Sequence, residues 1–228
     1  MKIILTALFF ILHGVAAVAQ NNEKTETRQL EPFDKIKISK GINVTLREGE
    51  KPEANIIILN AELEDVLIQQ QGRELTLKMK TKIYKDVAVN VYVSYQNIRE
   101  ILAGTGSSLD SEDIIEADQL LLEAGMDASI EMEVEVKKLK VSATAARVQV
   151  RGIADYIEVS ASTGGKYLGS ELECKEAYVR ASTGAMAQVY VTDKLDANAG
   201  TGAKVEYAGK PEKVAIKTTL GGKVEEVQ

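Results

Sequence analysis

Carboxylates are the side chains in this 228-residue chain that come closest to forming a reactive group. Asp110, Glu112 and Asp113 offer oxygen ligands of the kind that Ca²⁺ binds. A second acidic run contains Asp127, Glu131, Glu133 and Glu135. Glycoside hydrolysis needs two carboxylates at a set separation across a substrate. The three glutamates alternate with apolar residues, so they share the outer face of one strand. We expect a solvated acidic surface, and we predict no catalytic and no metal-binding residue.

The composition gives little support for nucleophilic catalysis or for a bound cofactor. The only histidine, His13, lies near the amino terminus, and Cys174 is the only cysteine. A lone cysteine forms no disulfide within the chain, and without a nearby histidine it lacks the usual activating base. We therefore expect Cys174 to be a small structural residue, and we expect no cofactor.

Three tyrosines are the remaining candidates for contact with a ligand. Tyr84, Tyr92 and Tyr95 lie close together in sequence, and tyrosine rings stack on sugars as well as packing into cores. Any enzymatic site would have to lie in this less regular third of the chain, around residues 47–55 or 80–86. We treat the tyrosines as candidate surface contacts, with burial in the core as the alternative.

Residues 1–19 have the pattern of a secretory signal peptide. A charged start and an apolar run end in Ala17-Val18-Ala19, and the run is too short for a typical membrane span. Residues 20–32 are polar and lack periodicity, so we expect a flexible leader before a single domain over 33–228. We predict an exported protein with no membrane-spanning segment after cleavage. Its formal net charge of −6 makes nucleic acid a poor partner.

The elements that must position any site are short repeats over residues 99–228, after an irregular part over 33–98. Every 18 to 21 residues an alanine, or once a threonine, stands just before a turn rich in small residues. We call these positions the anchor column: Ala103, Ala124, Ala143, Ala161, Ala181, Ala199 and Thr218. A fixed short period indicates that each repeat is one structural unit stacked on the next.

Each repeat alternates apolar and polar residues with a period of two, which is typical of a strand with one buried face. Four residues before the anchor column, only Arg99 interrupts an otherwise apolar series. The third repeat fits if its turn is one residue shorter, which places Val148 in the apolar column after the turn. Second turns are predicted at Gly152, Gly169, Asp193, and Gly209 with Pro211.

These features predict an all-β protein, a right-handed parallel β-helix or β-solenoid with coils of about 19 residues. Stacked coils bring equivalent residues into ladders, and a methyl group suits the narrow interior beside a sharp turn. Helix pairs need longer repeats. An antiparallel sandwich remains the alternative, although the pattern shows no regular inversion.

The irregular part shows weaker signals. Ile36 and Ile38 followed by Lys40-Gly41-Ile42-Asn43 resemble one further coil, with Lys40 in the anchor column. Two runs, 66–70 and 75–79, flank a turn and predict a hairpin. Residues 87–93 alternate as one strand. We expect these strands to cover the amino-terminal end of the solenoid, because an open stack exposes unpaired backbone groups.

The segment Phe33-Asp34-Lys35-Ile36-Lys37-Ile38, then Gly41-Ile42-Asn43 and the Ala-Ser-Thr-Gly repeats, resembles the head GIN domain family of auto-transporter adhesins. The resemblance covers about residues 33–228, and Gly41, Ile42 and Asn43 would form the tripeptide of the family name. It implies a β-helix-like fold, an adhesive role and secretion by a Gram-negative bacterium of the Bacteroidetes kind, to the periplasm or cell surface. It carries no catalytic residue.

Three functions remain open from the sequence. We expect a non-enzymatic binding, adhesin-like or scaffolding protein of the cell envelope, whose partner is a glycan or a surface protein. A carbohydrate-active enzyme with a site in the amino-terminal third is the first alternative. The second is a structural protein that associates end to end through its last coil, around Val214–Val227, as a homo-oligomer.

Overall fold

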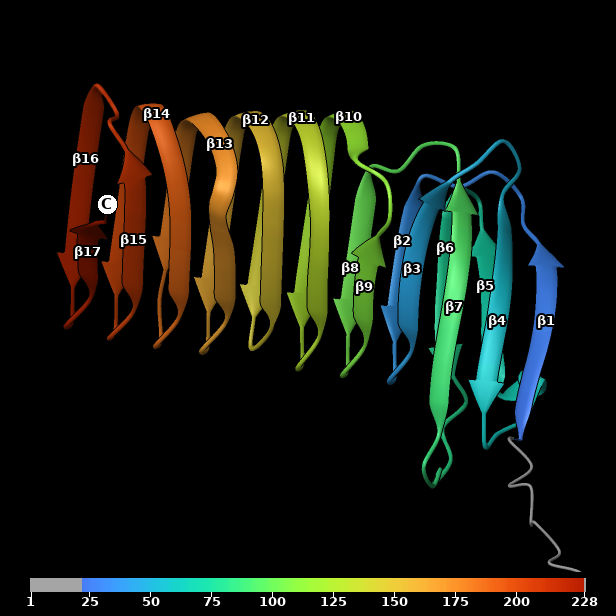
Figure 1. Ribbon diagram of the computed structural model, residues 1–228. Coiled ribbons are helices and arrows are strands. Elements are labelled where there is room, and N and C mark those ends of the chain that lie inside the picture. The colour runs from blue at the N-terminus through green and yellow to red at the C-terminus, as the bar shows by residue number, and fades with distance from the viewer. Residues whose placement is uncertain (1–21, 228) are drawn as a thin grey trace, which may run out of the picture.

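The computed structural model describes residues 22–227, which form one continuous stack of β-strands (Figure 1). The predicted signal peptide at residues 1–19 lies outside the described residues. Within them, no helix has the length and apolar character needed to cross a bilayer. The amino-terminal elements are β1 (Glu23–Gln29), β2 (Lys35–Ser39), β3 (Asn43–Glu48), β4 (Glu53–Leu59), the 3-10 helix η1 (Leu63–Asp65), β5 (Val66–Gln71), β6 (Glu74–Met79) and β7 (Ala88–Tyr95).

The repeats form a β-solenoid of about seven turns over residues 100–226, with coils of about 19 residues, as predicted. Their strands are β8 (Glu100–Gly104), β9 (Ser108–Ser111), β10 (Ile115–Gly125), β11 (Ser129–Thr144), β12 (Arg147–Ser162), β13 (Lys166–Ala181), β14 (Met186–Gly200), β15 (Lys204–Gly209), β16 (Lys213–Thr219) and β17 (Lys223–Glu226). Neighbouring coils pair in parallel, so that each coil continues the sheet of the one before (Figure 1).

The anchor column is confirmed by strand register. Ala124 pairs with Ala143, Ala143 with Ala161, and so on to Thr218, and the six alanines of the column are buried. Most of the turns that follow place two successive residues at positive φ, such as Thr105 at 51° and Gly106 at 64°. This is the geometry of a type I′ turn, and it explains why glycine recurs at the second position.

The third repeat has the shortened turn that its spacing predicts. Only Ala145 has positive φ there, and Val148 pairs with Ile130 on one side and Tyr167 on the other. The second turn predicted at Gly209 with Pro211 is present, because β15 ends at Gly209 and β16 begins at Lys213, whereas those predicted at Gly152, Gly169 and Asp193 do not interrupt their strands. In β11 to β14 the backbone bends without ending the strand, and register shifts near Gly169 absorb the corner.

The coil at Gly41 stacks on the repeats, but its register corrects one prediction. β2 and β3 pair in parallel with β8 and β9, and the residue opposite Ala103 is Ile38. Lys40 does not occupy the anchor column; it is exposed and has a φ of 65°, in the turn position of Thr105. A long charged side chain has no room in the interior, so the apolar Ile38 takes that place.

The predicted cap is present. β6 and β7 form the next layer beyond β2 and β3, and β4 and β5 pair antiparallel with β7 and β6. The predicted hairpin is β5–β6, and Val89, Val91 and Val93 of β7 are buried. The flexible leader over 20–32 was a wrong prediction for residues 23–29. These form β1, which pairs antiparallel with β4 and covers its open edge.

One corner of the solenoid is irregular because the chain leaves the stack after β3. The chain then builds the cap and returns to the stack through residues 96–99. This segment passes over the layer of β2 and β3, because it connects the layer of β7 to the layer of β8 (Figure 1). The start of β10 therefore pairs with β11, while β8 reaches only as far as Leu121. The corner that results is hollowed.

Candidate functional site

The three tyrosines named as contact candidates do not form one surface. Tyr95 is buried, and burial raises the pKa of its hydroxyl to about 12. Tyr92 lies on β7 beneath Arg47, whose guanidinium carbon is 4.2 Å from the ring centroid. Tyr84 precedes β7, in the loop that enters it. Only Tyr84 belongs to a segment that projects from the molecule.

That segment, residues 80–87, is called the tip loop here. It joins β6 to β7 in the place where other coils have a tight turn, and it extends past the row of turns (Figure 1). Ile83 stands in it with a relative exposure of 101%, the highest of any large apolar residue among those described. The tip loop carries three exposed lysines and one acid: Lys80, Lys82, Lys85 and Asp86.

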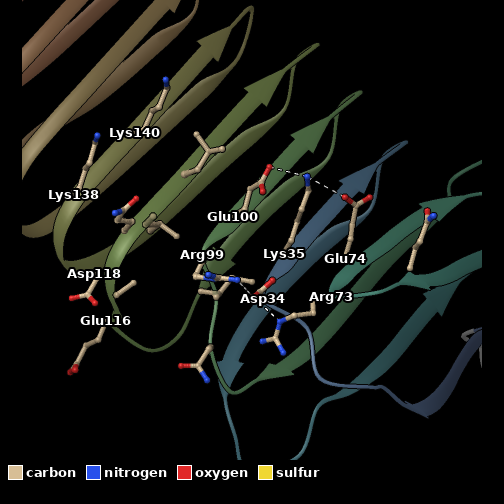
Figure 2. A pocket seen from close by; sticks show the side chains of 17 residues that line it. Asp34, Lys35, Arg73, Glu74, Arg99, Glu100, Glu116, Asp118, Lys138 and Lys140 are labelled. Carbon is tan, nitrogen blue, oxygen red and sulfur yellow. Dashed lines mark hydrogen bonds and ion pairs between the residues drawn. The ribbon is translucent and has the colours of Figure 1, made fainter.

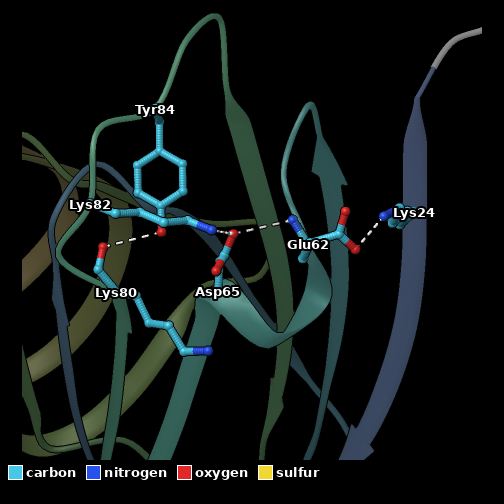
Figure 3. A network of polar contacts seen from close by, with 6 residues as sticks. All are labelled: Lys24, Glu62, Asp65, Lys80, Lys82 and Tyr84. Carbon is cyan, nitrogen blue, oxygen red and sulfur yellow. Dashed lines mark hydrogen bonds and ion pairs between the residues drawn. The ribbon is translucent and has the colours of Figure 1, made fainter.

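A polar network holds the tip loop in place (Figure 3). Asp65 of η1 is buried and forms an ion pair of 2.5 Å with Lys82, which lowers the pKa of the carboxyl group. The Lys80 amide donates to the Asp65 carbonyl at 2.8 Å, and the Tyr84 hydroxyl donates to the Lys80 carbonyl at 3.1 Å. Glu62 donates its amide to the same carboxylate. These contacts fix the base of the loop and leave Ile83 outside.

The charge of the tip loop is opposite to that of the whole chain. Three lysines against Asp86 give the segment a formal charge of +2, whereas the chain has −6. Lys40 in the neighbouring turn adds a further positive charge, because its ammonium group lies 2.5 Å from the Thr81 hydroxyl. The sequence signal for this site is the group of lysines on both sides of Ile83 and Tyr84. The positions of the tyrosines alone do not indicate it.

A second candidate site is the hollow at the irregular corner, with a volume of about 1140 Å³ (Figure 2). Asp34 lies at its edge, between Arg73 and Arg99. The Arg73 Nε donates to Asp34 Oδ2 at 2.7 Å, and Arg99 Nη2 donates to the same oxygen. Burial of the carboxyl group opposes ionisation, but the two guanidinium groups outweigh it and lower the pKa of Asp34. Arg99 is the charge that interrupts the apolar series in the sequence.

A second charged row runs beside the first (Figure 2). The Lys35 ammonium lies 3.2 Å from Glu74 and 2.9 Å from Glu100. The sign thus alternates along both rows and between them. Further around the hollow lie Glu116, Asp118, Lys138 and Lys140, with the amides of Gln71, Asn97 and Gln119.

The acidic residues considered for chemistry are separated by their partners. Glu112 pairs with Arg47 at 2.6 Å, and Asp113 accepts the Glu48 amide at 2.7 Å. Glu131 pairs with Arg151 at 2.7 Å. Asp110, beside Thr45, has a raised pKa because of desolvation. Across residues 22–227 no three acidic, histidine or cysteine side chains are grouped as a metal would require.

Cys174 and the Gly41-Ile42-Asn43 tripeptide have structural positions. The Cys174 thiol is buried, lies 3.2 Å from the Tyr190 carbonyl, and has its pKa raised to about 12 by burial. Gly41 forms the turn with a φ of 71°, and Ile42 is buried in the core. Asn43 donates its amide to Asn90 and accepts from Ser108, which links three neighbouring coils.

Comparison with solved structures supports the fold. A "putative adhesin" from Bacteroides fragilis is 15% identical, with a TM-score of 0.81 over 90% of this chain and 97% of its own. One from Parabacteroides merdae is 22% identical, with a TM-score of 0.74 over 92% and 98%. A "putative lipid binding protein" from Parabacteroides distasonis is 14% identical, with a TM-score of 0.73 over 92% and 98%.

No curated protein matches the chain. None of the three descriptions above names an enzyme. Residues 32–211 match the family described as "Putative auto-transporter adhesin, head GIN domain", which is most of the chain and spans both the cap and the repeats. The chain therefore belongs to the head GIN domain family.

Proposed function

We propose that this chain is an exported, non-enzymatic surface-binding protein that docks on anionic lipid through the tip loop. The observation that carries the proposal is Ile83, fully exposed at the end of a loop that is fixed at its base and surrounded by lysines. Where it stands, the Ile83 side chain buries no apolar area and contributes nothing to the core. At a membrane interface, the apolar side chain enters the headgroup region while lysines contact phosphates.

The expected affinity of one loop is low. Burying an isoleucine side chain contributes about 2 kcal/mol, and each lysine at an anionic surface about 1 kcal/mol. Lys82 is held by Asp65, so Lys80 and Lys85 are the free contributors within the loop. Together these contributions correspond to a Kd of about 1 mM for lipid. Such docking is reversible and is strengthened when several copies act on one surface.

The comparisons lend support of two kinds. The description of the Parabacteroides distasonis relative names lipid as what that protein binds, and the other relatives named above are described as adhesins. Their source organisms, Bacteroides and Parabacteroides, fit export into an envelope. An adhesin-like role and lipid docking are compatible, because a protein that binds at the envelope needs a way to remain on its surface.

Co-sedimentation with vesicles tests the proposal. The protein should sediment with vesicles of phosphatidylglycerol and phosphatidylcholine, and much less with phosphatidylcholine alone. Ile83→Asp and the double variant Lys80→Gln/Lys85→Gln should each reduce binding about tenfold, since each removes about 1.4 kcal/mol or more. Two controls match them: Met126→Asp, another exposed apolar turn residue, and Lys166→Gln/Lys194→Gln on the repeats.

Equal binding by the tip-loop variants and their controls would contradict the proposal. So would binding to neutral and anionic vesicles alike, or binding to a glycan array by a protein that ignores both kinds of vesicle. The last result would favour the glycan partner expected from the sequence.

Self-association is a second candidate function, favoured by one observation. Val214 and Ile216 of β16 are 44% and 50% exposed, and within residues 22–227 the outer edge of β16 has no strand partner. The same coil carries both charge signs on its outer side, for example Lys217 and Glu225. A mass in light scattering that rises with concentration, and falls in Ile216→Lys, would support self-association; a monomer throughout would refute it.

A further inference from the structure

The interior of the solenoid changes character at the hollow. In the repeats, the inward position at the start of each coil is held by buried apolar residues such as Leu120, Leu139 and Ile157. In the three layers nearest the cap the same position holds Arg73, Asp34 and Arg99, as the register of β2 with β6 and β8 shows. Asp34 is the buried member of this charged ladder, and the two arginines open toward the hollow instead of packing in the core.

Asp34 holds the two arginines in a fixed arrangement. Its amide donates to the Arg73 carbonyl at 3.1 Å, and the Arg99 amide donates to the Asp34 carbonyl at 2.8 Å. The side chains then meet at one carboxylate oxygen (Figure 2). Backbone and side-chain contacts together fix the positions of both guanidinium groups before any ligand arrives, and such preorganisation lowers the entropy cost of binding.

Both guanidinium groups have hydrogen-bond capacity to spare. A guanidinium carries five N–H donors, and Asp34 takes one from each arginine through a single oxygen. The side chains of Arg73 and Arg99 are 57% and 68% exposed, and both line the hollow. Two positive charges share one negative charge, so this row alone has a net charge of +1.

The rest of the lining favours a polar ligand. Amides of Gln71, Asn97 and Gln119 supply donors and acceptors, while Lys138 and Lys140 add two positive charges that Glu116 and Asp118 balance. The residues that line the hollow include no aromatic ring on which a ligand could stack. Oxygen-rich groups with negative charge match these side chains best, because the arginine fork binds carboxylate and sulfate oxygens in pairs.

We propose that the hollow binds the carboxylate or sulfate groups of an acidic polysaccharide through Arg73 and Arg99, with Asp34 as the positioning residue. The neighbouring row of Lys35 between Glu74 and Glu100 has a net charge of −1, so the two rows together are neutral. Because the charges of the two rows cancel, electrostatic attraction between the hollow and an acidic ligand acts only at contact distance. Binding is weak, and it falls as salt screens the exposed groups.

Isothermal titration of the full chain with three polymers tests this site. Polygalacturonate presents carboxylates, dextran sulfate presents sulfates, and dextran presents neither. Binding to one or both acidic polymers and not to dextran is expected, and the better of the two identifies the preferred group. Arg73→Gln and Arg99→Gln should each weaken binding about tenfold. Arg147→Gln, at an exposed arginine of β12 that contacts Gln149, should leave it unchanged.

Two further measurements separate the site from a purely structural role. Arg73→Lys keeps the charge and the neighbourhood of Asp34 but loses the fork, so its affinity should lie between those of the wild type and Arg73→Gln. Thermal unfolding identifies any variant that fails to fold. Folded Arg73→Gln and Arg99→Gln proteins with wild-type affinity would overturn the proposal, as would equal binding of dextran. Vesicle binding through the tip loop should be unchanged in these variants, so the two proposals fail separately.

Discussion

The repeats and the cap reverse the direction of the chain with different kinds of connection. In the repeats, the turns that directly follow the anchor column contain a single charged residue, Asp127, and most of them reverse the chain with two residues at positive φ. In the cap, the corresponding connection is the tip loop, which has four charged residues and an exposed isoleucine. A turn selected only for stacking needs small residues. The tip loop departs from this pattern through its net positive charge, on which the proposed lipid docking rests.

The interiors show the same contrast. Along the repeats, the core is an uninterrupted series of apolar ladders, and volume changes are matched between neighbours: Tyr167 lies between Val148 and the small Ala187. Near the cap, Asp34 and its arginines replace one of these ladders. The comparison shows that both candidate sites lie where the repeat pattern is interrupted.

The largest expected difference between the two regions is in thiol reactivity. Cys174 is buried in the repeats with a pKa of about 12, so at pH 8 it should react with a maleimide at least about 1000-fold more slowly than an exposed thiol of pKa about 8.5. The single-thiol variant Ile83→Cys/Cys174→Ala should react at the exposed rate. Mass spectrometry of timed samples gives both rates. Fast labelling of native Cys174 would mean that the coils open easily.

A methyl group at Gly152 should damage the repeats strongly. The residue has a φ of 109°, and a Cβ there would lie 2.1 Å from the Val134 carbonyl oxygen in the neighbouring coil. Gly152→Ala should lower the free energy of unfolding by about 3 kcal/mol or more. Gly104→Ala is the matched control, because nothing lies within 4 Å of its Cβ position. Urea denaturation compares the two, and similar midpoints would argue against close stacking at this corner.

Asp34→Asn should weaken the junction between cap and repeats by about 2 kcal/mol, since two charge-assisted hydrogen bonds to a buried carboxylate are lost. The pKa of Asp34 is lower in the folded protein than its ordinary value near 3.9. Its stabilisation is therefore fully present above pH 4 and disappears as the pH falls through the lowered value. The difference in unfolding free energy between wild type and variant should shrink over that range. A difference independent of pH would exclude the ion pairs as its cause.

Tyr167→Phe should have the smallest effect. The Tyr167 hydroxyl is buried in the repeats and has no hydrogen-bond partner among residues 22–227. Removing it relieves an unsatisfied polar group, so stability should stay the same or rise by up to about 1 kcal/mol. Differential scanning calorimetry measures the change, with Tyr207→Phe in a less enclosed position as the comparison. A loss above 1 kcal/mol would show that the hydroxyl is bonded after all.

Much of the fold follows from the sequence because stacking in register makes spacing visible. The anchor column, the short turn at Ala145 and the β5–β6 hairpin were all predictable from residue type and period. The errors have physical causes. Lys40 precedes a glycine just as an anchor residue does, and only the register shows that it belongs to the turn. Residues 23–29 are polar because β1 is an outer strand, and so they resembled a leader.

The candidate sites were harder to predict. Arg99 stood out as the one charge in an apolar column, but its partner Asp34 lies 65 residues away and Arg73 arrives from the cap hairpin. Only the path of the chain through the cap brings them together. The exposure of Ile83 depends on the Asp65 network beneath it, which no local pattern reveals.

The chain contains no tryptophan, so a single one at position 83 would report directly on the central claim. Ile83→Trp, titrated with phosphatidylglycerol vesicles, should show a blue-shifted emission that brominated lipid quenches, because the side chain enters the interface. Met126→Trp, on a turn of the repeats, should show neither change. Emission from position 83 that does not respond to the vesicles, or that matches the response at position 126, would contradict lipid docking through the tip loop.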